Sequence, residues 1–353
     1  HVVTKKGKGF EPAEDQPVRF HGTSCFDVAS GRALQTAGKS ATYTDVFGAA
    51  LVGVAQKDER ICAVTAAMPE GTGLTCFQEE FPERFFDVGI AEEHAVGMAA
   101  GLAQAGFKPF VAIYSTFLQR AYDQIIEELC LQDLGAVLCL DRAGVVGEDG
   151  PTHHGVFDIA YLRALPNVTV MAPADKEDME AMLRFAAGWN GPAALRYPRD
   201  TIALRPATVP FAEVRPGKAE VWQKGSDVAI LALGSMSCPA LEAARVLLAD
   251  NIHASVVNAR FVKPLDETRI RQLYLECGAL LIVEEGVVRG GFGSAVLETL
   301  SAAGLLTETP KPLRCIGLPN EFITFDTRKA LLERYGLTPL AIAAAAKELL
   351  SKA

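Results

Sequence analysis

The segment 141–155 gathers side chains that can transfer protons and bind anions. It holds four glycines, three acidic residues, one arginine and two histidines, and it follows an apolar run typical of a buried strand. Core packing does not require these polar side chains, and ordered loops of this kind usually carry function. A histidine close to an acid and an arginine suits proton transfer and anion binding. We therefore predict that this segment forms part of a functional site.

Acidic residues also stand where a predicted strand runs directly into a helix. The sequence from Phe86 to His94 places Glu92 and Glu93 in the first turn of that helix. In an open parallel sheet, ligands bind beyond the carboxyl ends of the strands, so a carboxylate here can reach a ligand. The alternative is that both carboxylates only complement the helix dipole, which contributes about 0.3 to 1 kcal/mol.

A second strand-to-helix junction carries two aromatic rings and an arginine. Tyr114 and Phe117 are three residues apart and can present their rings on one side, and Arg120 continues the same helical face. Packing of both rings in the core is the alternative interpretation. Taken alone, these residues favour packing in the core, but an arginine on that face needs a polar partner.

Two arginines end the last predicted strand of the first half of the chain, in the sequence from Arg196 to Asp200. The guanidinium fork matches phosphate geometry, so a phosphorylated substrate is one interpretation and a solvated surface is the other. The glycine-rich segment 289–294 lacks the G-x-G-x-x-G spacing of a dinucleotide loop. We interpret it as close backbone packing at the start of a helix.

All these segments lie in two series of alternating strand-like and helical stretches, which predict parallel sheets covered by helices on both faces. The first series predicts strands at 61–66, 85–89, 109–114, 136–141, 168–172 and 193–197, with helices at 44–56, 91–105, 117–131 and 175–188. The second predicts strands at 228–233, 254–259, 279–284 and 313–317, with helices at 239–249, 267–276, 291–304, 327–335 and 339–350. The predicted fold class is therefore α/β, with two doubly wound domains.

The domain boundaries follow from composition. At 353 residues the chain is long enough for two domains of about 150 residues each. We expect residues 1–38, rich in Lys, Gly, Pro and Glu, to be a connector from a missing N-terminal domain, since the sequence begins in the middle of a pattern. A linker at 201–225, which contains three prolines, then separates a domain at 39–200 from one at 226–353.

Composition excludes several classes of protein. The formal net charge of −9 disfavours nucleic-acid binding, because neutralising phosphates requires a concentrated face of Lys and Arg. No apolar run reaches the roughly 20 residues needed to span a bilayer, and no signal-peptide core stands near the N-terminus, so we expect a soluble cytoplasmic protein. The eight cysteines form no C-x-x-C pair, and we expect them to be reduced and buried rather than bound to zinc or joined in disulfides.

In this order, the segments resemble the pyrimidine-binding and C-terminal domains of the transketolase superfamily, over essentially the whole chain. Glu92 falls at the position of the family's key glutamate, and the segment from Gly147 to His153 is similar to its G-x-D-G-x-T-H loop. Further segments resemble the branch of the superfamily that forms 1-deoxy-D-xylulose 5-phosphate, namely 1–14, 20–22, 65–73, 113–124 and 141–144.

The resemblance implies thiamine diphosphate as the cofactor. Glu92 is then expected to hydrogen-bond the aminopyrimidine ring and start a proton relay, while the cofactor carries the carbanion chemistry. Phe117 is expected to stack on the pyrimidine, which contributes about 0.5 to 1.5 kcal/mol beyond buried area. Further cofactor contacts are expected from Tyr114, Arg120, Phe10 and Met68.

The resemblance also implies the substrates, pyruvate and glyceraldehyde 3-phosphate. Arg142 and Arg199 are the candidates for binding the phosphate through charge-assisted contacts. His21, Asp149 and His153 are expected to line the substrate channel and manage protons. A homodimer is implied by the family alone.

Two departures from the family pattern are visible. Glu93 stands where glutamine is usual, and we expect it to face away from the cofactor. The family places its Mg²⁺ ligands and diphosphate contacts in an N-terminal domain, and no residues of this chain match that domain, so we expect the isolated fragment to bind the whole cofactor poorly and to be inactive.

Two other readings stay open. The β subunit of a 2-oxo-acid dehydrogenase or a split transketolase has the same pair of domains and a similar length, but begins near the first helix. A non-catalytic dimerisation module that kept the fold and lost the chemistry is the second. The intact glutamate, aromatic pair and acid–histidine loop argue against it.

Overall fold

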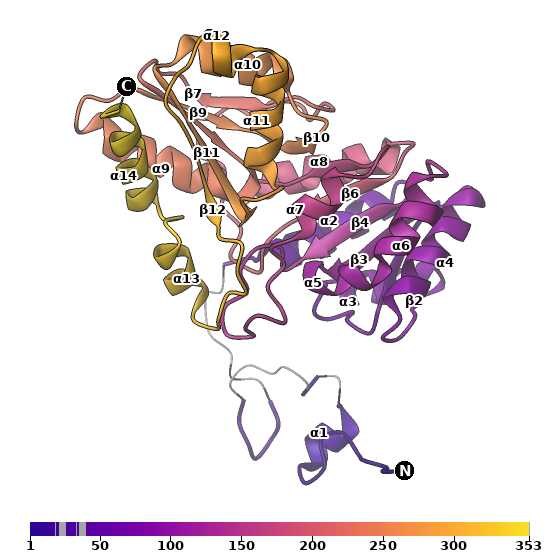
Figure 1. Ribbon diagram of the computed structural model, residues 1–353. Helices are drawn as coiled ribbons and strands as arrows, with labels where there is room; N and C mark the ends of the chain where they lie inside the picture. Colours follow the sequence, from indigo (N-terminus) through magenta and orange to yellow (C-terminus); the bar gives the residue numbers. More distant parts are fainter. Residues whose placement is uncertain (18, 21–25, 33, 35–39, 353) are drawn as a thin grey trace. The chain divides into compact units, whose positions relative to one another are not determined.

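A computed structural model describes residues 1–17, 19–20, 26–32, 34 and 40–352 (Figure 1). These residues divide into two units, His1–Ser40 and Ala41–Ala353. The smaller unit contains one short helix, α1 (Glu11–Asp15), next to a cluster of three phenylalanine rings whose centroids lie 5.3 to 5.7 Å apart. The predicted connector therefore has local structure of its own. Both predicted domains lie in the larger unit.

The first domain is built on a seven-stranded sheet with the order β10-β5-β6-β4-β3-β1-β2. Six of its strands run parallel: β1 (Ile61–Thr65), β2 (Phe85–Asp87), β3 (Lys108–Tyr114), β4 (Val137–Asp141), β5 (Thr169–Met171) and β6 (Ala193–Arg196). Neighbouring residues of one strand pack in different cores: Val111 contributes to one hydrophobic cluster and Phe110 to another. Because side chains alternate across a strand, both faces of this sheet are covered, which explains its continuous apolar runs.

Helices surround this sheet (Figure 1). The first of them begins with a capping box. Thr42 accepts a hydrogen bond from the N–H of Asp45, and the Asp45 carboxylate accepts one from the N–H of Thr42. The helices are α2 (Tyr43–Ala55), α3 (Thr75–Glu80), α4 (Glu92–Gln104), α5 (Ser115–Leu118), α6 (Tyr122–Gln124), α7 (Asp158–Arg163) and α8 (Lys176–Gly188), with 3₁₀ turns η1 (Pro82–Arg84) and η2 (Gln119–Ala121) and a π-helix η3 (Ile125–Cys130).

The second domain has a five-stranded sheet with the order β12-β11-β8-β9-β7. Its strands are β7 (Glu220–Gln223), β8 (Val228–Ala232), β9 (Ala254–Asn258), β11 (Ala279–Val287) and β12 (Leu313–Leu318), of which only β7 pairs antiparallel. Its helical segments are η4 (Gly234–Met236), α9 (Ser237–Leu248), α10 (Glu267–Glu276), α11 (Phe292–Ala302), α12 (Leu305–Glu308), α13 (Arg328–Arg334) and α14 (Pro339–Leu350). The predicted α/β class with two doubly wound domains is confirmed.

The two domains share structure rather than meeting at a simple linker. Strand β10 (Phe261–Lys263) follows β9 of the second domain, yet pairs antiparallel with β5 in the sheet of the first. One hydrophobic cluster also combines Ile159 of the first domain with Leu231 and Ile282 of the second.

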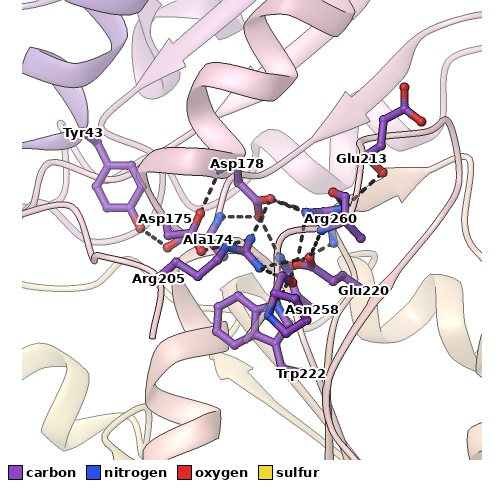
Figure 2. Close-up of polar contacts among 12 residues, drawn as sticks. Tyr43, Ala174, Asp175, Asp178, Arg205, Glu213, Glu220, Trp222, Asn258 and Arg260 are labelled. Carbon is purple, nitrogen blue, oxygen red and sulfur yellow. Dashed lines mark hydrogen bonds and ion pairs between the residues drawn. The ribbon is translucent and has the colours of Figure 1, made fainter. Parts of the chain in front are cut away.

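A buried network of charges crosses the same boundary (Figure 2). Arg260, only 1% exposed, donates to Oδ1 of Asp178 in α8 at 2.7 and 3.0 Å and lies 3.0 Å from Oε2 of Glu220 in β7. Arg205 lies in the segment that connects β6 of the first sheet to β7 of the second. It donates to Oε1 of Glu220 at 2.9 Å and lies 3.1 Å from Oδ2 of Asp175. Three carboxylates and two guanidiniums thus tie the domains together out of contact with water.

The observed elements differ from the predicted ones in several places, and the short helices α3, α7 and α12 were not predicted. The single helix predicted at 117–131 is a series of short α, 3₁₀ and π turns, because a periodic apolar pattern does not distinguish these turn types. Strand β7 lies inside the range 201–225 that was predicted to be a linker. Strand β10, which the sequence did not predict, has three residues and a partner far away in sequence.

Among the described helices, none combines the length and apolar character needed to cross a membrane. All seven described cysteines are free; four are buried, as predicted, but Cys76 is exposed and Cys238 and Cys315 are half-buried. The prediction was wrong for Cys76 because it lies on the outer side of α3. In the same part of the chain, no three His, Cys, Asp or Glu side chains are placed to hold a metal ion.

Candidate cofactor and substrate site

The carboxyl ends of the parallel strands of the first domain meet at one edge of the sheet. The register sets Thr65 at the end of β1 beside Asp87, the last residue of β2. It also sets Tyr114 at the end of β3 beside Asp141, the last residue of β4. The loops that leave this edge carry most of the predicted site residues, at the place where open parallel sheets bind ligands.

Glu92 is the first residue of α4 and enters the helix from β2. Asp87 shapes the junction, since its Oδ1 accepts hydrogen bonds from the N–H of Ala67 at 2.8 Å and of Gly89 at 3.0 Å. Gly89 has a φ of +72°, which a residue with a side chain rarely adopts. The turn leaves Glu92 only 3% exposed while Glu93 faces solvent. The two acids of this turn therefore have different environments, and only Glu92 is enclosed.

Arg120 is the partner of the Glu92 carboxylate. Its Nη1 donates a hydrogen bond to Oε1 of Glu92 at 2.5 Å, and the arginine side chain remains 48% exposed. The polar partner that an arginine on this face needs is thus an acid from the neighbouring junction. In the part of the chain that the structure describes, no hydrogen bond reaches Oε2 of Glu92, so this oxygen keeps its capacity to accept one.

The aromatic pair lies next to this ion pair. The rings of Tyr114 and Phe117 are stacked, with centroids 5.5 Å apart and 16° between the ring planes. The guanidinium of Arg120 lies over the Phe117 ring at 5.1 Å from its centroid, and the His153 ring meets Phe117 edge to face at 5.4 Å. The predicted placement of two rings on one side with Arg120 on the same face is confirmed. Burial raises the pKa of Tyr114 to about 12, so its hydroxyl stays protonated at neutral pH.

Arg142 covers the other side of the aromatic pair. Its guanidinium lies 3.8 Å from the Tyr114 ring centroid, and its Nη1 donates to the Gly71 carbonyl at 2.5 Å and to Asp141 Oδ1 at 2.8 Å. A φ of +61°, uncommon for a residue with a side chain, turns it onto the ring. Asp141 is fully buried, and burial raises its pKa to about 6 although Arg142 and the Thr44 hydroxyl oppose the shift. A ligand phosphate at Arg142 therefore shares this guanidinium with partners in the protein.

The loop after β4 brings the remaining predicted residues to the same place. Gly144 and Gly155 close it by exchanging backbone hydrogen bonds of 2.7 and 2.9 Å. Asp149, near its tip, accepts a hydrogen bond from Arg199 Nη1 at 2.9 Å, and both side chains are nearly half exposed. The charges of Arg199 and Asp149 both influence the pKa of Tyr114, which places them within electrostatic reach of the aromatic pair.

Met68 lies beside Tyr114 in the loop after β1. A Cβ added at Gly71 would come 2.0 Å from the Tyr114 Oη and 3.0 Å from the Met68 Cε. The glycine thus allows this loop to lie against the ring. Of the other predicted site residues, Phe10 is in the separate unit His1–Ser40, and His21 lies outside the described residues.

Two segments noted in the sequence are structural. Arg196 is buried, and its Nε donates to Asp158 at 2.8 Å, so only Arg199 of that pair faces the site. In the glycine-rich segment, the carboxylate of Glu284 accepts the N–H of Phe292 at 2.8 Å and of Gly293 at 2.7 Å. Burial raises the pKa of Glu284 to about 7. The interpretation of this segment as close packing at a helix start is confirmed.

Sequence reasoning missed two charged residues of the second domain that contact the site loop, Glu285 and Arg328. Glu285 is 1% exposed and accepts the N–H of Val145 at 2.9 Å, and Arg328 donates to the Val145 carbonyl at 2.5 Å. The signal available in the sequence was a pair of acids, Glu284 and Glu285, at the end of an apolar strand where no exposed face is expected.

The cluster fits the pyrimidine end of thiamine diphosphate. A buried carboxylate with one oxygen free of hydrogen bonds matches a donor on a heterocycle, and the half-buried Phe117 ring beside it is of the kind that stacks on a heterocycle. Glu92, Phe117, Tyr114 and Arg120 would hold that ring. These four residues provide no binding site for the diphosphate or for its metal ion.

Comparisons with known proteins identify the family of this chain. Residues 39–203 match the family of transketolase pyrimidine-binding domains, and residues 217–342 match the family of transketolase C-terminal domains. A split-gene transketolase, described as an inactive β4 tetramer, superimposes with a TM-score of 0.78 and 35% identity, over 88% of this chain and 98% of that one. A mutant transketolase of Pichia stipitis superimposes with a TM-score of 0.72 and 19% identity, over 90% of this chain and 47% of that one, which shows the shared fold. The chain belongs to the transketolase family.

Within that family, the similarity is to one kind of enzyme. The chain is 51% identical to 1-deoxy-D-xylulose-5-phosphate synthase 1 of Geobacter sulfurreducens over 99% of its own length and 55% of that protein. It is also 51% identical to 1-deoxy-D-xylulose-5-phosphate synthase of Pelotomaculum thermopropionicum, over 96% of the chain and 52% of that protein. The chain thus spans about half the length of the curated relatives it matches.

Proposed function

We propose that this chain supplies the pyrimidine-binding and C-terminal domains of a thiamine-diphosphate-dependent transferase. Its reaction is the decarboxylative condensation of pyruvate with D-glyceraldehyde 3-phosphate to 1-deoxy-D-xylulose 5-phosphate and CO₂. That reaction is the first step of the non-mevalonate isoprenoid pathway. The observation that carries the proposal is the buried Glu92, with one oxygen open, beside an aromatic stack and two arginines. The similarity to synthases of this kind at 51% identity supports it.

Glu92 is the residue that starts the chemistry in this proposal. Bound thiamine diphosphate supplies the carbanion chemistry, while the protein supplies orientation and electrostatics. The open Oε2 of Glu92 takes the hydrogen bond to the aminopyrimidine ring, and Arg120 holds Oε1 from the other side. Phe117 would hold the ring by stacking, and Tyr114 supports the Phe117 ring from its own stacked position.

Arg199 and Arg142 bind the phosphate of the aldehyde substrate. Arg199 is about half exposed and pairs with an equally exposed acid, Asp149, so its charge can turn to an anion at little cost. Arg142 adds a second charge from the other side of the Tyr114 ring. Asp149 and His153 then stand within reach of the substrate to move protons, with His153 held edge-on against Phe117.

Product analysis tests the proposal. The chain is combined with a diphosphate-binding domain, Mg²⁺ and thiamine diphosphate, and supplied with pyruvate and glyceraldehyde 3-phosphate. We expect deoxyxylulose phosphate and CO₂, without lipoamide or a ketose donor, and we expect the isolated chain to be inactive. Formation of neither product by the combined enzyme would contradict the proposal.

A second candidate is the smaller subunit of a two-chain transketolase. The observation that favours it is the coverage of 98% of the split-gene transketolase chain at 35% identity. The same assay with a ketose donor and an aldose acceptor separates the two, since only a transketolase then makes a new ketose. In either case we propose a cytoplasmic, self-associating enzyme, and sedimentation of the complete enzyme measures whether it is a dimer.

A further inference from the structure

The loop that carries Arg142, Asp149 and His153 is held from the second domain. Glu285 of β11 accepts the N–H of Val145 at 2.9 Å. A Cβ added at Gly144, whose φ is +80°, would come 2.1 Å from Oε1 of that carboxylate. The loop therefore approaches Glu285 as closely as its backbone allows, and only glycine permits this approach.

Arg328, the first residue of α13, connects Glu285 to two parts of the site. Its Nη2 donates to Glu285 Oε2 at 2.7 Å, and its Nη1 donates both to Glu285 Oε1 and, at 2.5 Å, to the Val145 carbonyl. Its Nε donates to Asp200 Oδ2 at 2.7 Å. Burial acts to lower the pKa of Arg328, but the carboxylates of Glu285 and Asp200 outweigh it and raise the pKa above its usual range. All three nitrogens of this guanidinium are thus engaged, and it stays charged.

The chain just before Arg328 rests on the tip of the same loop. A Cβ added at Gly147, whose φ is +88°, would come 2.8 Å from the backbone N of Arg328 and 3.1 Å from the Asp326 carbonyl. A Cβ at Gly150 would touch the Cβ of Phe325 at 3.4 Å. Contacts from the second domain therefore cover the loop from Gly144 to Gly150.

These contacts end next to the two arginines of the proposed phosphate site. Val145 is three residues after Arg142, and Asp200 directly follows Arg199. Arg142 and Arg199 come from separate segments, and in the part of the chain described here Arg199 is held only by the exposed Asp149. A glycine-rich loop loses more backbone entropy on ordering than other loops, so its position has to be imposed by contacts from outside.

We propose that the Glu285–Arg328 pair is a positioning device of the C-terminal domain, which holds Arg142 and Arg199 in one arrangement for a phosphate group. This inference rests on the proposed function, since it takes the phosphate site as given. Glu285 and Arg328 are positioning residues: they touch the loop and Asp200, and the arginines touch the ligand. The C-terminal domain thereby determines preference for a phosphorylated over a non-phosphorylated substrate.

Arg328→Gln, Arg328→Lys and Glu285→Gln in the 353-residue chain test the inference. Hydrogen exchange measures the protection of the backbone amides in the loop 141–155. Calorimetric titration measures the affinity of the site for inorganic phosphate, with pyruvate as the comparison ligand. The matched control is Arg314→Gln, which breaks an exposed Arg–Glu pair of the same domain, with Glu348. Thermal unfolding shows whether each variant is folded. If Arg328→Gln does not fold, Arg328→Lys and Glu285→Gln test the inference in its place.

We expect Arg328→Gln to speed exchange in 141–155 about tenfold or more and to weaken phosphate binding about tenfold, with pyruvate unchanged. Arg328→Lys and Glu285→Gln should change both in the same direction by less, and Arg314→Gln should change neither. Unchanged exchange in the folded variants overturns the inference whatever the substrate is. Faster exchange with unchanged phosphate affinity overturns it while the proposed function stands. A wild-type chain that does not bind phosphate overturns the proposed phosphate site and this inference with it.

Discussion

The substitution Asp175→Asn tests whether the buried network in Figure 2 carries one negative charge too many. The network contains the carboxylates of Asp175, Asp178 and Glu220 but only two guanidiniums. Asp175 is fully buried and caps α8 by accepting the N–H of Asp178 at 2.8 Å. Asparagine caps helices about as well as aspartate, so the substitution removes the charge and keeps the cap. The network then has as many positive as negative charges.

The magnitude follows from the proton affinity of this carboxyl. Burial raises the pKa of Asp175 to about 7, and the nearby charge of Asp178 adds to the shift. An aspartate in the unfolded chain titrates near 3.9, so the folded state binds the proton more tightly. The free energy of unfolding therefore falls as the pH rises from about 4 to about 7, by about 1.4 kcal/mol per pKa unit and thus on the order of 4 kcal/mol in all.

Urea unfolding at about pH 5 and about pH 8 measures this loss of stability. Between these two pH values we expect wild type to lose on the order of 2 to 3 kcal/mol that Asp175→Asn does not lose, so that the variant is the more stable protein at the higher pH. Asp250→Asn, at an exposed carboxylate paired with Lys347, is the control and should leave the pH dependence unchanged. A variant with the wild-type pH dependence, or one less stable at high pH, would refute the reasoning.

Three further predictions concern the site and the domain boundary. Arg199→Ala in the complete enzyme should raise the KM for glyceraldehyde 3-phosphate about tenfold and the KM for pyruvate little, because only the aldehyde carries a phosphate. Equal increases in the two KM values would show that Arg199 does not bind the phosphate. Gly71→Ala should destabilise the chain by about 1 to 3 kcal/mol in thermal unfolding and weaken cofactor binding, because its Cβ would lie 2.0 Å from the Tyr114 Oη. Gly97→Ala is the control and should have neither effect, because the space around Gly97 is open. Equal stability of the two variants would contradict this packing. Arg260→Met should lower the free energy of unfolding by about 3 to 5 kcal/mol in urea, since it leaves three buried carboxylates with Arg205 as their one remaining guanidinium, and a loss below about 1 kcal/mol would mean that the network does not depend on it.

Much of the fold could be predicted because the strands are apolar runs bounded by polar turns. The runs predicted at 61–66 and 136–141 correspond to β1 and β4, which are buried along their whole length. Strand β10 could not be predicted in this way, since its three residues pair with β5 across the domain boundary. Its pairing depends on the tertiary structure, and local periodicity carries no signal for it.

The candidate site also contains some residues that the sequence indicates and others that it does not. Glu92, Tyr114 and Arg120 could be proposed from the sequence because they stand at strand ends in polar or aromatic junctions, and the structure brings these junctions together. Arg260 and Arg328 could not, because a charged residue read from sequence is assigned to the surface unless its partner is known. Their partners lie in distant parts of the chain. Asp178 meets Arg260 through the packing of the two domains, and Glu285 meets Arg328 through the fold of the second domain.

The central claim is that the enclosed carboxylate of Glu92 acts on the cofactor's aminopyrimidine ring. Turnover of pyruvate and glyceraldehyde 3-phosphate by the complete enzyme carrying Glu92→Gln tests it most directly, with Glu93→Gln as the control because that neighbouring acid faces solvent. We predict a loss of about 100-fold or more for Glu92→Gln with an unchanged fold, and near-normal turnover for Glu93→Gln. Near-normal turnover of Glu92→Gln, or an equal loss in both variants, would contradict the account.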